Sequence, residues 1–125
     1  MNIEEFRDYC LSLAGAEESM PWRDGRNEYD RGLLCLSVAG KWFAVVHVDE
    51  FEFCLLKCPP EHAERLREQY DGVRPGWHMN KRHWNSVLFD SDVADDAIRG
   101  MIRLAYDTVV GGLPRRLRES IAENG

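Results

Sequence analysis

Hydrophobic and polar residues alternate with two different periods along this chain. Near both ends the apolar residues recur every three or four positions, which is typical of amphipathic helices, and in the middle they recur every second position, which is typical of strands. The first helix is expected to begin at Asn2, which forms a capping-box pattern with Glu5, and to stop at Gly15. Its inward residues are Ile3, Phe6, Cys10 and Leu13.

Residues 34–38 and 42–48 have the strand period and are joined by a Gly40-Lys41 turn, so they predict a β-hairpin. A second tight turn at residues 49–50 leads into a third strand that starts at Phe51. The segment before the hairpin, residues 16–30, is polar and is expected to form an ordered loop or a short irregular strand. Within the hairpin, the alternation places Trp42 on the inward face.

The second half of the chain predicts two main helices separated by two strands. Pro59-Pro60 ends the third strand and begins a helix that stops near Gly72. A short segment at 73–77 and a strand at 84–89 follow. Ser91 or Asp92 is expected to cap a long helix that Gly111-Gly112 terminates, and a short helix follows it. The order α-βββ-α-ββ-α predicts an α+β fold, a single domain over residues 1–125 with helices packed against an antiparallel sheet.

Bulk composition narrows the class of protein. The 125 residues are 44% hydrophobic and 30% charged, as in globular domains. No apolar run approaches the ~20 residues that cross a bilayer, and the start Met1–Glu5 lacks the features of an export signal, so a cytoplasmic location without membrane contact is expected. The four cysteines then predict reduced thiols on apolar faces rather than disulfides.

The densest group of functional side chains lies in residues 75–87, with the sequence PGWHMNKRHWNSV. Its tryptophans offer flat faces for stacking, its asparagines offer hydrogen-bonding edges, and its basic pair suits a phosphate or carboxylate. The alternative is structural, with the block pinning a turn to the sheet. The candidate ligand-binding residues are Trp77, His78, Asn80, Lys81, Arg82, His83, Trp84 and Asn85, and the candidate phosphate-binding residues are Arg74, Lys81 and Arg82.

Metal binding and catalysis find less support in the residues. Cys54 and Cys58 are four apart on a strand, hence about 13 Å apart, too far to share a zinc ion. His83 has serine neighbours but no identifiable carboxylate to orient it, and Cys58 near a helix start is more typical of packing than of a reactive thiolate. We therefore predict no metal, no cofactor, no catalytic residue and no enzymatic activity.

The block at 75–87 also carries a family resemblance. Together with the segments LLKCP at 55–59, LREQY at 66–70 and YDTVV at 106–110, it is similar to the MmcQ/YjbR family of small bacterial proteins. The resemblance spans nearly the whole chain and implies the YjbR-like α+β fold. It also implies the function for which that family is commonly labelled, DNA binding.

Net charge bears on the implied DNA-binding role. The formal net charge is −6, whereas phosphate contacts from Lys and Arg supply most non-specific affinity for nucleic acid. A continuous basic strip through Arg74, Lys81 and Arg82 would favour DNA. A mixed surface would favour the alternative, an adaptor that binds a protein or a small anionic ligand and has no nucleic-acid role.

Overall fold

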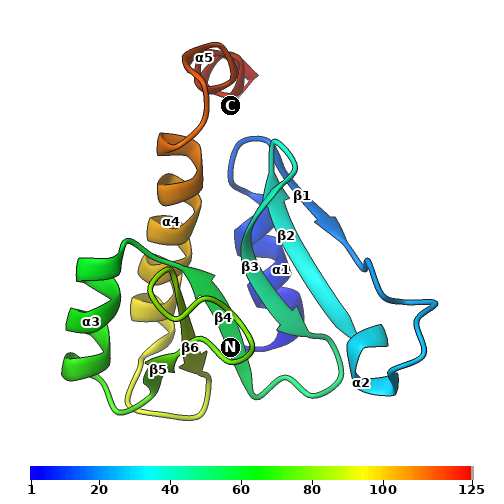
Figure 1. Ribbon diagram of the computed structural model, residues 1–125, viewed down its shortest axis with the longest axis vertical. Coiled ribbons are helices and arrows are strands. Elements are labelled where there is room, and N and C mark those ends of the chain that lie inside the picture. Colours follow the sequence, from blue (N-terminus) through cyan, green and yellow to red (C-terminus); the bar gives the residue numbers. More distant parts are fainter. Residues whose placement is uncertain (125) are drawn as a thin grey trace.

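A six-stranded antiparallel sheet with the strand order β1-β2-β3-β4-β6-β5 forms the centre of the computed structural model, which describes residues 1–124 (Figure 1). The strands are β1 (Ala16–Ser19), β2 (Leu33–Val38), β3 (Lys41–His47), β4 (Phe53–Lys57), β5 (Val73–Pro75) and β6 (Trp84–Leu88). The helices are α1 (Ile3–Leu11), α2 (Glu28–Arg31), α3 (Pro60–Gln69), α4 (Asp95–Gly111) and α5 (Arg115–Asn124). The predicted α+β class is confirmed; β1 is the short strand that was one of two expectations for residues 16–30, and α2 is an addition within that segment.

The first helix follows its sequence signals closely. The Asn2 side chain accepts a hydrogen bond from the Glu5 backbone, and the Glu5 side chain accepts one from the Asn2 backbone, so the capping box is present. The helix ends at Leu11, and Gly15 adopts a φ of +74°, the left-handed conformation that glycine tolerates best. The chain can therefore turn directly into β1.

The β2–β3 hairpin places Trp42 on a different face from the one predicted. Leu36 pairs with Ala44 and Ser37 with Trp42, which leaves Phe43 as an extra residue in β3. This bulge interrupts the alternation of faces. Phe43 is therefore completely buried beside Ala44 under the helices, while Trp42 is half-buried on the other face. The inward placement of Trp42 was wrong because the period-two pattern contains no signal for the bulge.

The cap predicted for the long helix was also wrong. Helix α4 begins at Asp95, and its N-cap Ala94 provides no side-chain hydrogen bond. The Asp92 carboxylate instead accepts hydrogen bonds from the backbone N–H groups of Asp71 and Gly72, at 2.8 and 2.7 Å. These bonds lower the pKa of Asp92. Asp92 thus ties the start of β5 to the segment before α4 rather than capping the helix.

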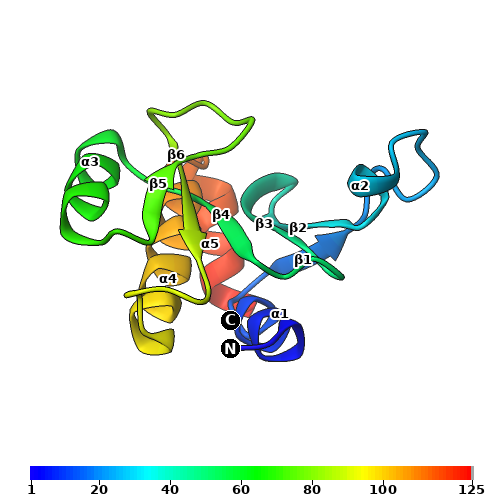
Figure 2. The same cartoon turned by 90° about the horizontal axis from the view of Figure 1, so that it is seen from below.

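The two faces of the sheet are covered differently (Figure 2). Helices α1 and α4 lie against one face, here called the helix face, and bury the larger apolar cluster there. On the opposite face, here called the open face, a smaller buried cluster consists of Cys35, Val45, Leu55 and Trp84. Figure 2 shows the β5–β6 connection and α2 on that side. Within residues 1–124, no helix is both long and apolar enough to cross a membrane.

Candidate binding site

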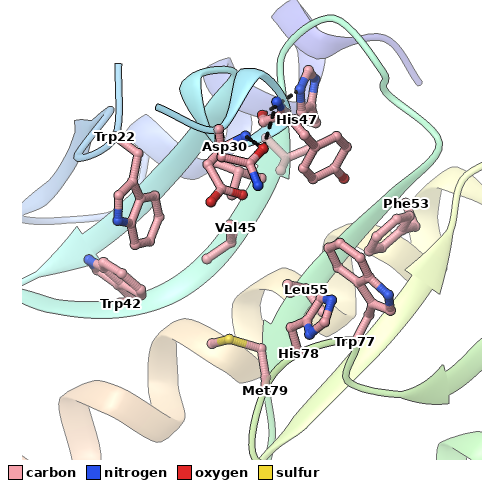
Figure 3. Close-up of a pocket in the computed structure, with 14 residues that line it drawn as sticks. Trp22, Asp30, Trp42, Val45, His47, Phe53, Leu55, Trp77, His78 and Met79 are labelled. Carbon is pink, nitrogen blue, oxygen red and sulfur yellow. Dashed lines mark hydrogen bonds between the residues drawn. The ribbon is translucent and has the colours of Figure 1, made fainter. Parts of the chain in front are cut away.

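A hollow lies on the open face, between α2 and the connection from β5 to β6 (Figure 3). It has a volume of about 710 Å³, within the range of sites that hold small organic ligands. Val45 and Leu55 contribute apolar side chains from the central strands β3 and β4, and Met79 contributes one from the connection. We call this hollow the aromatic cleft because indole, phenol and phenyl rings line both of its ends.

Trp22 and Trp42 form one end of the aromatic cleft. Their ring centroids are 5.5 Å apart and their planes meet at 74°, an edge-to-face arrangement. At the other end Trp77 makes edge-to-face contacts with Tyr29 at 5.7 Å and with Phe53 at 6.0 Å. Trp22 and Trp77 are 38% and 46% exposed, so aromatic surface faces the solvent at both ends. Such surface on an otherwise polar molecule is typical of a binding site.

The cleft has few polar groups, and they differ in whether they already form hydrogen bonds within the protein. His47 is buried, and its Nδ1 accepts backbone hydrogen bonds from Asp49 and Glu50 at 3.1 and 2.8 Å. Its Nε2–H therefore donates to the Tyr29 carbonyl oxygen at 3.0 Å. Both ring nitrogens are occupied, so His47 fixes α2 to the end of β3. The carboxylate of Asp30, in contrast, makes no hydrogen bond or ion pair with any residue of the described chain.

The turn that carries Trp77 and His78 into the cleft is fixed by its backbone. A Cβ at Gly76 would lie 2.7 Å from the Cβ of Trp84, so only glycine fits there. The Trp77 N–H donates to Ser86 Oγ at 3.0 Å, and the Met79 N–H donates to the Gly76 carbonyl at 3.2 Å. His78 adopts a φ of +57°, a left-handed conformation that is uncommon for residues other than glycine, although histidine adopts it more often than most. These constraints hold the Trp77 and His78 rings in place beside the cleft.

The basic residues of the same block lie away from the aromatic cleft. Lys81 and Arg82 line a separate hollow beside α3, together with Arg67 and the acidic Glu61 and Glu64. The Lys81 ammonium donates to the Gly76 carbonyl at 3.1 Å, so it stabilises the turn. The Arg74 guanidinium makes one long hydrogen bond, 3.4 Å, to the Asp71 carbonyl. The charges around Lys81 and Arg82 are mixed rather than uniformly basic.

Four other predicted site residues have partners inside the fold. Asn85 is 1% exposed, and its amide accepts from Arg67 Nε at 2.7 Å and donates to the Ala63 carbonyl at 3.3 Å. Trp84 is 6% exposed and belongs to the buried open-face cluster. Within the turn, Asn80 accepts a hydrogen bond from the Arg82 N–H, and the His83 carbonyl accepts one from Cys58. These contacts match the structural alternative for this half of the block.

Arg67 organises the second half of the block, although it was not among the candidate site residues and entered the sequence analysis only as part of the LREQY segment. Besides Asn85, its guanidinium donates to the carbonyl oxygens of Lys81 and Trp84, the latter at 3.3 Å. One side chain on α3 thus satisfies three acceptors from the turn and from β6. Arg67 fixes the turn from the side opposite to the cleft.

The cysteines are buried and their thiols are protonated at neutral pH. Burial raises the pKa of Cys10 and Cys35 to about 12 and that of Cys54 well above its usual value. Burial also raises the pKa of Cys58 to about 11, although Arg67 lowers it in part, so the helix start does not produce a reactive thiolate there. Across residues 1–124, no three side chains of the His, Cys, Asp and Glu types are grouped so that they would hold a metal ion.

The sequence prediction missed the residues that α2 and the central strands contribute to the cleft. Tyr29 and Asp30 lie in a segment expected to form an ordered loop or a short irregular strand, and His47 and Phe53 lie in strands to which no binding role was assigned. A usable signal was present, because β3 and β4 are apolar at nearly every position rather than at alternate ones. Strands of that kind are usually covered on both faces.

Comparison with known proteins identifies relatives of the chain. The YjbR family model matches residues 11–108. A protein of Escherichia coli (strain K12) named "Uncharacterized protein YjbR" is 33% identical over 124 residues, which cover 98% of this chain and 99% of that protein. "Uncharacterized protein YyaQ" of Bacillus subtilis (strain 168) is 35% identical over 57 residues, 46% of this chain and 48% of that protein.

Two solved structures share the architecture. The crystal structure of Deinococcus radiodurans protein DR2400, described as a DUF419 domain, has a TM-score of 0.83 and 23% identity and covers 97% of this chain and 88% of its own. A crystal structure of a Pseudomonas syringae protein has a TM-score of 0.68, 23% identity and coverages of 86% and 98%. At these identities the likeness shows the fold alone.

Proposed function

The chain belongs to the YjbR family, and we propose that it is a non-enzymatic binding module whose site is the aromatic cleft. The ligand is a small organic molecule with an apolar or aromatic body. The observation that carries this proposal is the cleft itself, about 710 Å³ of space with exposed tryptophan at both ends and apolar residues between them. A ligand of this type gains both from desolvation and from edge-to-face contact with the rings.

Binding is a better account of the cleft than catalysis. Of the cleft's titratable side chains, His47 has both ring nitrogens engaged by backbone groups. The lining residues described here include no serine, threonine, cysteine or lysine to act as a nucleophile. The cysteines are buried elsewhere with raised pKa values. Tyr29, Asp30 and His78 remain, and all three are suited to orienting a bound ligand.

The cleft also differs from a nucleic-acid site. Its described lining contains no lysine or arginine, and the hollow that contains Lys81 and Arg82 also contains Glu61 and Glu64. Phosphate contacts dominate nucleic-acid affinity, so this charge distribution and the net charge of −6 support a small-molecule ligand over DNA. DNA binding, implied by the family resemblance, is the alternative outcome of the test.

The four tryptophans allow a direct test by ¹H–¹⁵N NMR of their indole N–H signals. Addition of indole as a neutral probe is expected to shift the signals of Trp22, Trp42 and Trp77 and leave the buried Trp84 unchanged. Trp77→Ala is expected to weaken binding of the probe by about 1–2 kcal/mol, because one aromatic wall is lost. Equal shifts at all four signals, or none at millimolar indole, would contradict a site in the cleft.

A second titration, with single- and double-stranded oligonucleotides at low salt, tests the alternative. No binding at micromolar concentration is expected. If binding occurs, falls with salt and is weakened by Arg82→Glu but not by Arg116→Glu on α5, nucleic acid is the partner and the cleft proposal is wrong.

A further inference from the structure

We infer that the aromatic cleft selects an organic cation, with a substituted ammonium group placed between the Asp30 carboxylate and the indole faces. This inference rests on the proposed function and adds the charge of the ligand to it. Figure 3 shows Asp30 at the cleft between Trp22 and His47, with Val45 below it. Asp30 is the only acidic residue among the described lining residues.

The Asp30 carboxylate is free to serve as a counter-ion. Its backbone N–H donates to the Asn27 side chain at 3.3 Å as part of the α2 cap, which fixes the residue without using its carboxylate. The carboxylate itself has no hydrogen-bonding or ionic partner anywhere in residues 1–124. Asp30 is half-buried, so a cation that reaches it would exchange part of its hydration for this ion pair.

The aromatic rings of the cleft, like the Asp30 carboxylate, favour a positively charged ligand. Tryptophan and tyrosine faces attract cations through their ring quadrupoles, and alkylated ammonium groups bind well because they are weakly hydrated. The protein already contains one such contact, since the Lys57 ammonium lies 5.3 Å from the centroid of the Trp84 ring on the same face of the sheet. Trp22 and Trp77 remain 38% and 46% exposed, so part of the aromatic surface of the cleft is accessible to a ligand.

Negative charge surrounds the Tyr29 end of the cleft. A neighbouring hollow shares Tyr29 and His47 with the cleft and adds three acids, Glu28, Asp49 and Glu50. Burial, together with the carboxylates of Glu50, Glu52 and Asp30, raises the pKa of Tyr29. These carboxylates favour a bound cation over an anion at that end of the cleft.

Two lysines lie near the cleft on the side away from Tyr29, and their charges would favour an anionic ligand instead of a cationic one. Lys41 and Lys57 line a second neighbouring hollow, which shares Trp42 and Met79 with the cleft. Neither lysine lines the cleft itself. If they governed selection, an anionic ligand would bind better than a cationic one.

A matched pair of probes separates charge from shape. Choline and 3,3-dimethylbutan-1-ol have the same size and differ in the charged nitrogen. Choline is expected to bind about 5- to 30-fold more tightly, the effect of a partly desolvated cation–π contact, with shifts at Trp22, Trp42 and Trp77. Equal affinity of the two probes, or tighter binding of 3,3-dimethylbutyrate than of choline, would overturn the inference.

Asp30→Asn tests the counter-ion and has a matched control on the same segment. The change is expected to reduce choline affinity by about 5- to 30-fold and to leave the affinity for the neutral alcohol unchanged. Asp24→Asn removes the same charge from a side chain that is 94% exposed and is expected to change neither. Equal effects of the two variants would overturn the role of Asp30.

The outcomes also distinguish this inference from the proposed function. If indole shifts the three cleft signals but choline shows no advantage over its neutral isostere, the cleft is a binding site without charge selection. If neither indole nor choline shifts any cleft signal, both proposals are wrong.

Discussion

The helix face and the open face of the sheet are formed by the same strands, but they are covered to different extents. On the helix face, α1 and α4 bury large side chains such as Phe6, Phe43 and Ile98 completely. On the open face, the covering groups are single side chains from loops and from the short helix α2, and Trp22 and Trp77 remain partly exposed. By burial, we expect the helix face to provide most of the stability, while the open face retains a hollow of about 710 Å³.

Phe43 and Trp42 test this comparison most directly, because they are adjacent in β3 and lie on opposite faces. Phe43→Ala is expected to lower the free energy of unfolding by about 3–5 kcal/mol through a cavity beside Tyr106, whose ring centroid is 5.6 Å away. Trp42→Ala is expected to cost about 1–2 kcal/mol, because its ring is only half-buried. Urea denaturation of both variants measures the difference.

Similar losses for Phe43→Ala and Trp42→Ala would mean that the open face is packed as firmly as the helix face. A larger loss for Trp42→Ala would restore the simple alternation and contradict the bulge. The indole NMR titration provides the complementary control, since Trp42→Ala is expected to remove one wall of the cleft while Phe43 does not line it.

The sequence predicted the helix face better than the open face, because the two faces depend on different kinds of sequence pattern. The helix face depends on local periodicity and on caps, so α1, the β2–β3 hairpin and the apolar stripe of α4 were all predicted. The open face depends on contacts between distant segments, for example Trp22 with Trp42 and Tyr29 with Trp77. No local pattern encodes which loops meet above a sheet.

The block at residues 75–87 illustrates the same limit within one motif. Its composition indicated a site, and the structure divides it into two parts. Trp77 and His78 line the cleft, whereas Asn85 and the Lys81 carbonyl are bound by Arg67 from α3. The turn geometry at Gly76 and the contacts of Arg67, nine positions earlier on α3, decide which part a residue joins. Neither is visible in the composition of the block.

Asn85 and Asn80 offer a second, smaller test of this division. Asn85→Ala leaves the half-buried Arg67 guanidinium without one acceptor, so a loss of about 1–3 kcal/mol in unfolding free energy is expected. Asn80→Ala removes a side chain that is exposed and bonded only to the Arg82 N–H, so a loss of about 0.5 kcal/mol is expected. Comparable losses in the two denaturation curves would show that the exposed part of the block is as structural as the buried part.

The thiols provide the finest comparison of the two faces, because Cys10 lies on the helix face and Cys35 beneath the cleft. Burial raises the pKa of each from 9.0 to about 12 in the folded state. Above pH 9 the unfolded chain loses these protons while the folded chain retains them. Stability is therefore fully present below pH 9 and falls as pH rises toward 12, by about 1.4 kcal/mol per pH unit for each thiol.

Urea denaturation between pH 8 and 10.5 measures this slope in the wild type, in Cys10→Ala and in Cys35→Ala. Each variant is expected to reduce the slope by a similar amount, whatever its own loss of stability at pH 8, because each removes one thiol whose pKa is raised to about 12. If Cys35→Ala leaves the slope unchanged while Cys10→Ala reduces it, water reaches Cys35 through the open face. The side chains around the cleft would then cover the sheet less completely than α1 and α4 do, and the difference between the two faces would extend below the cleft to the sheet itself.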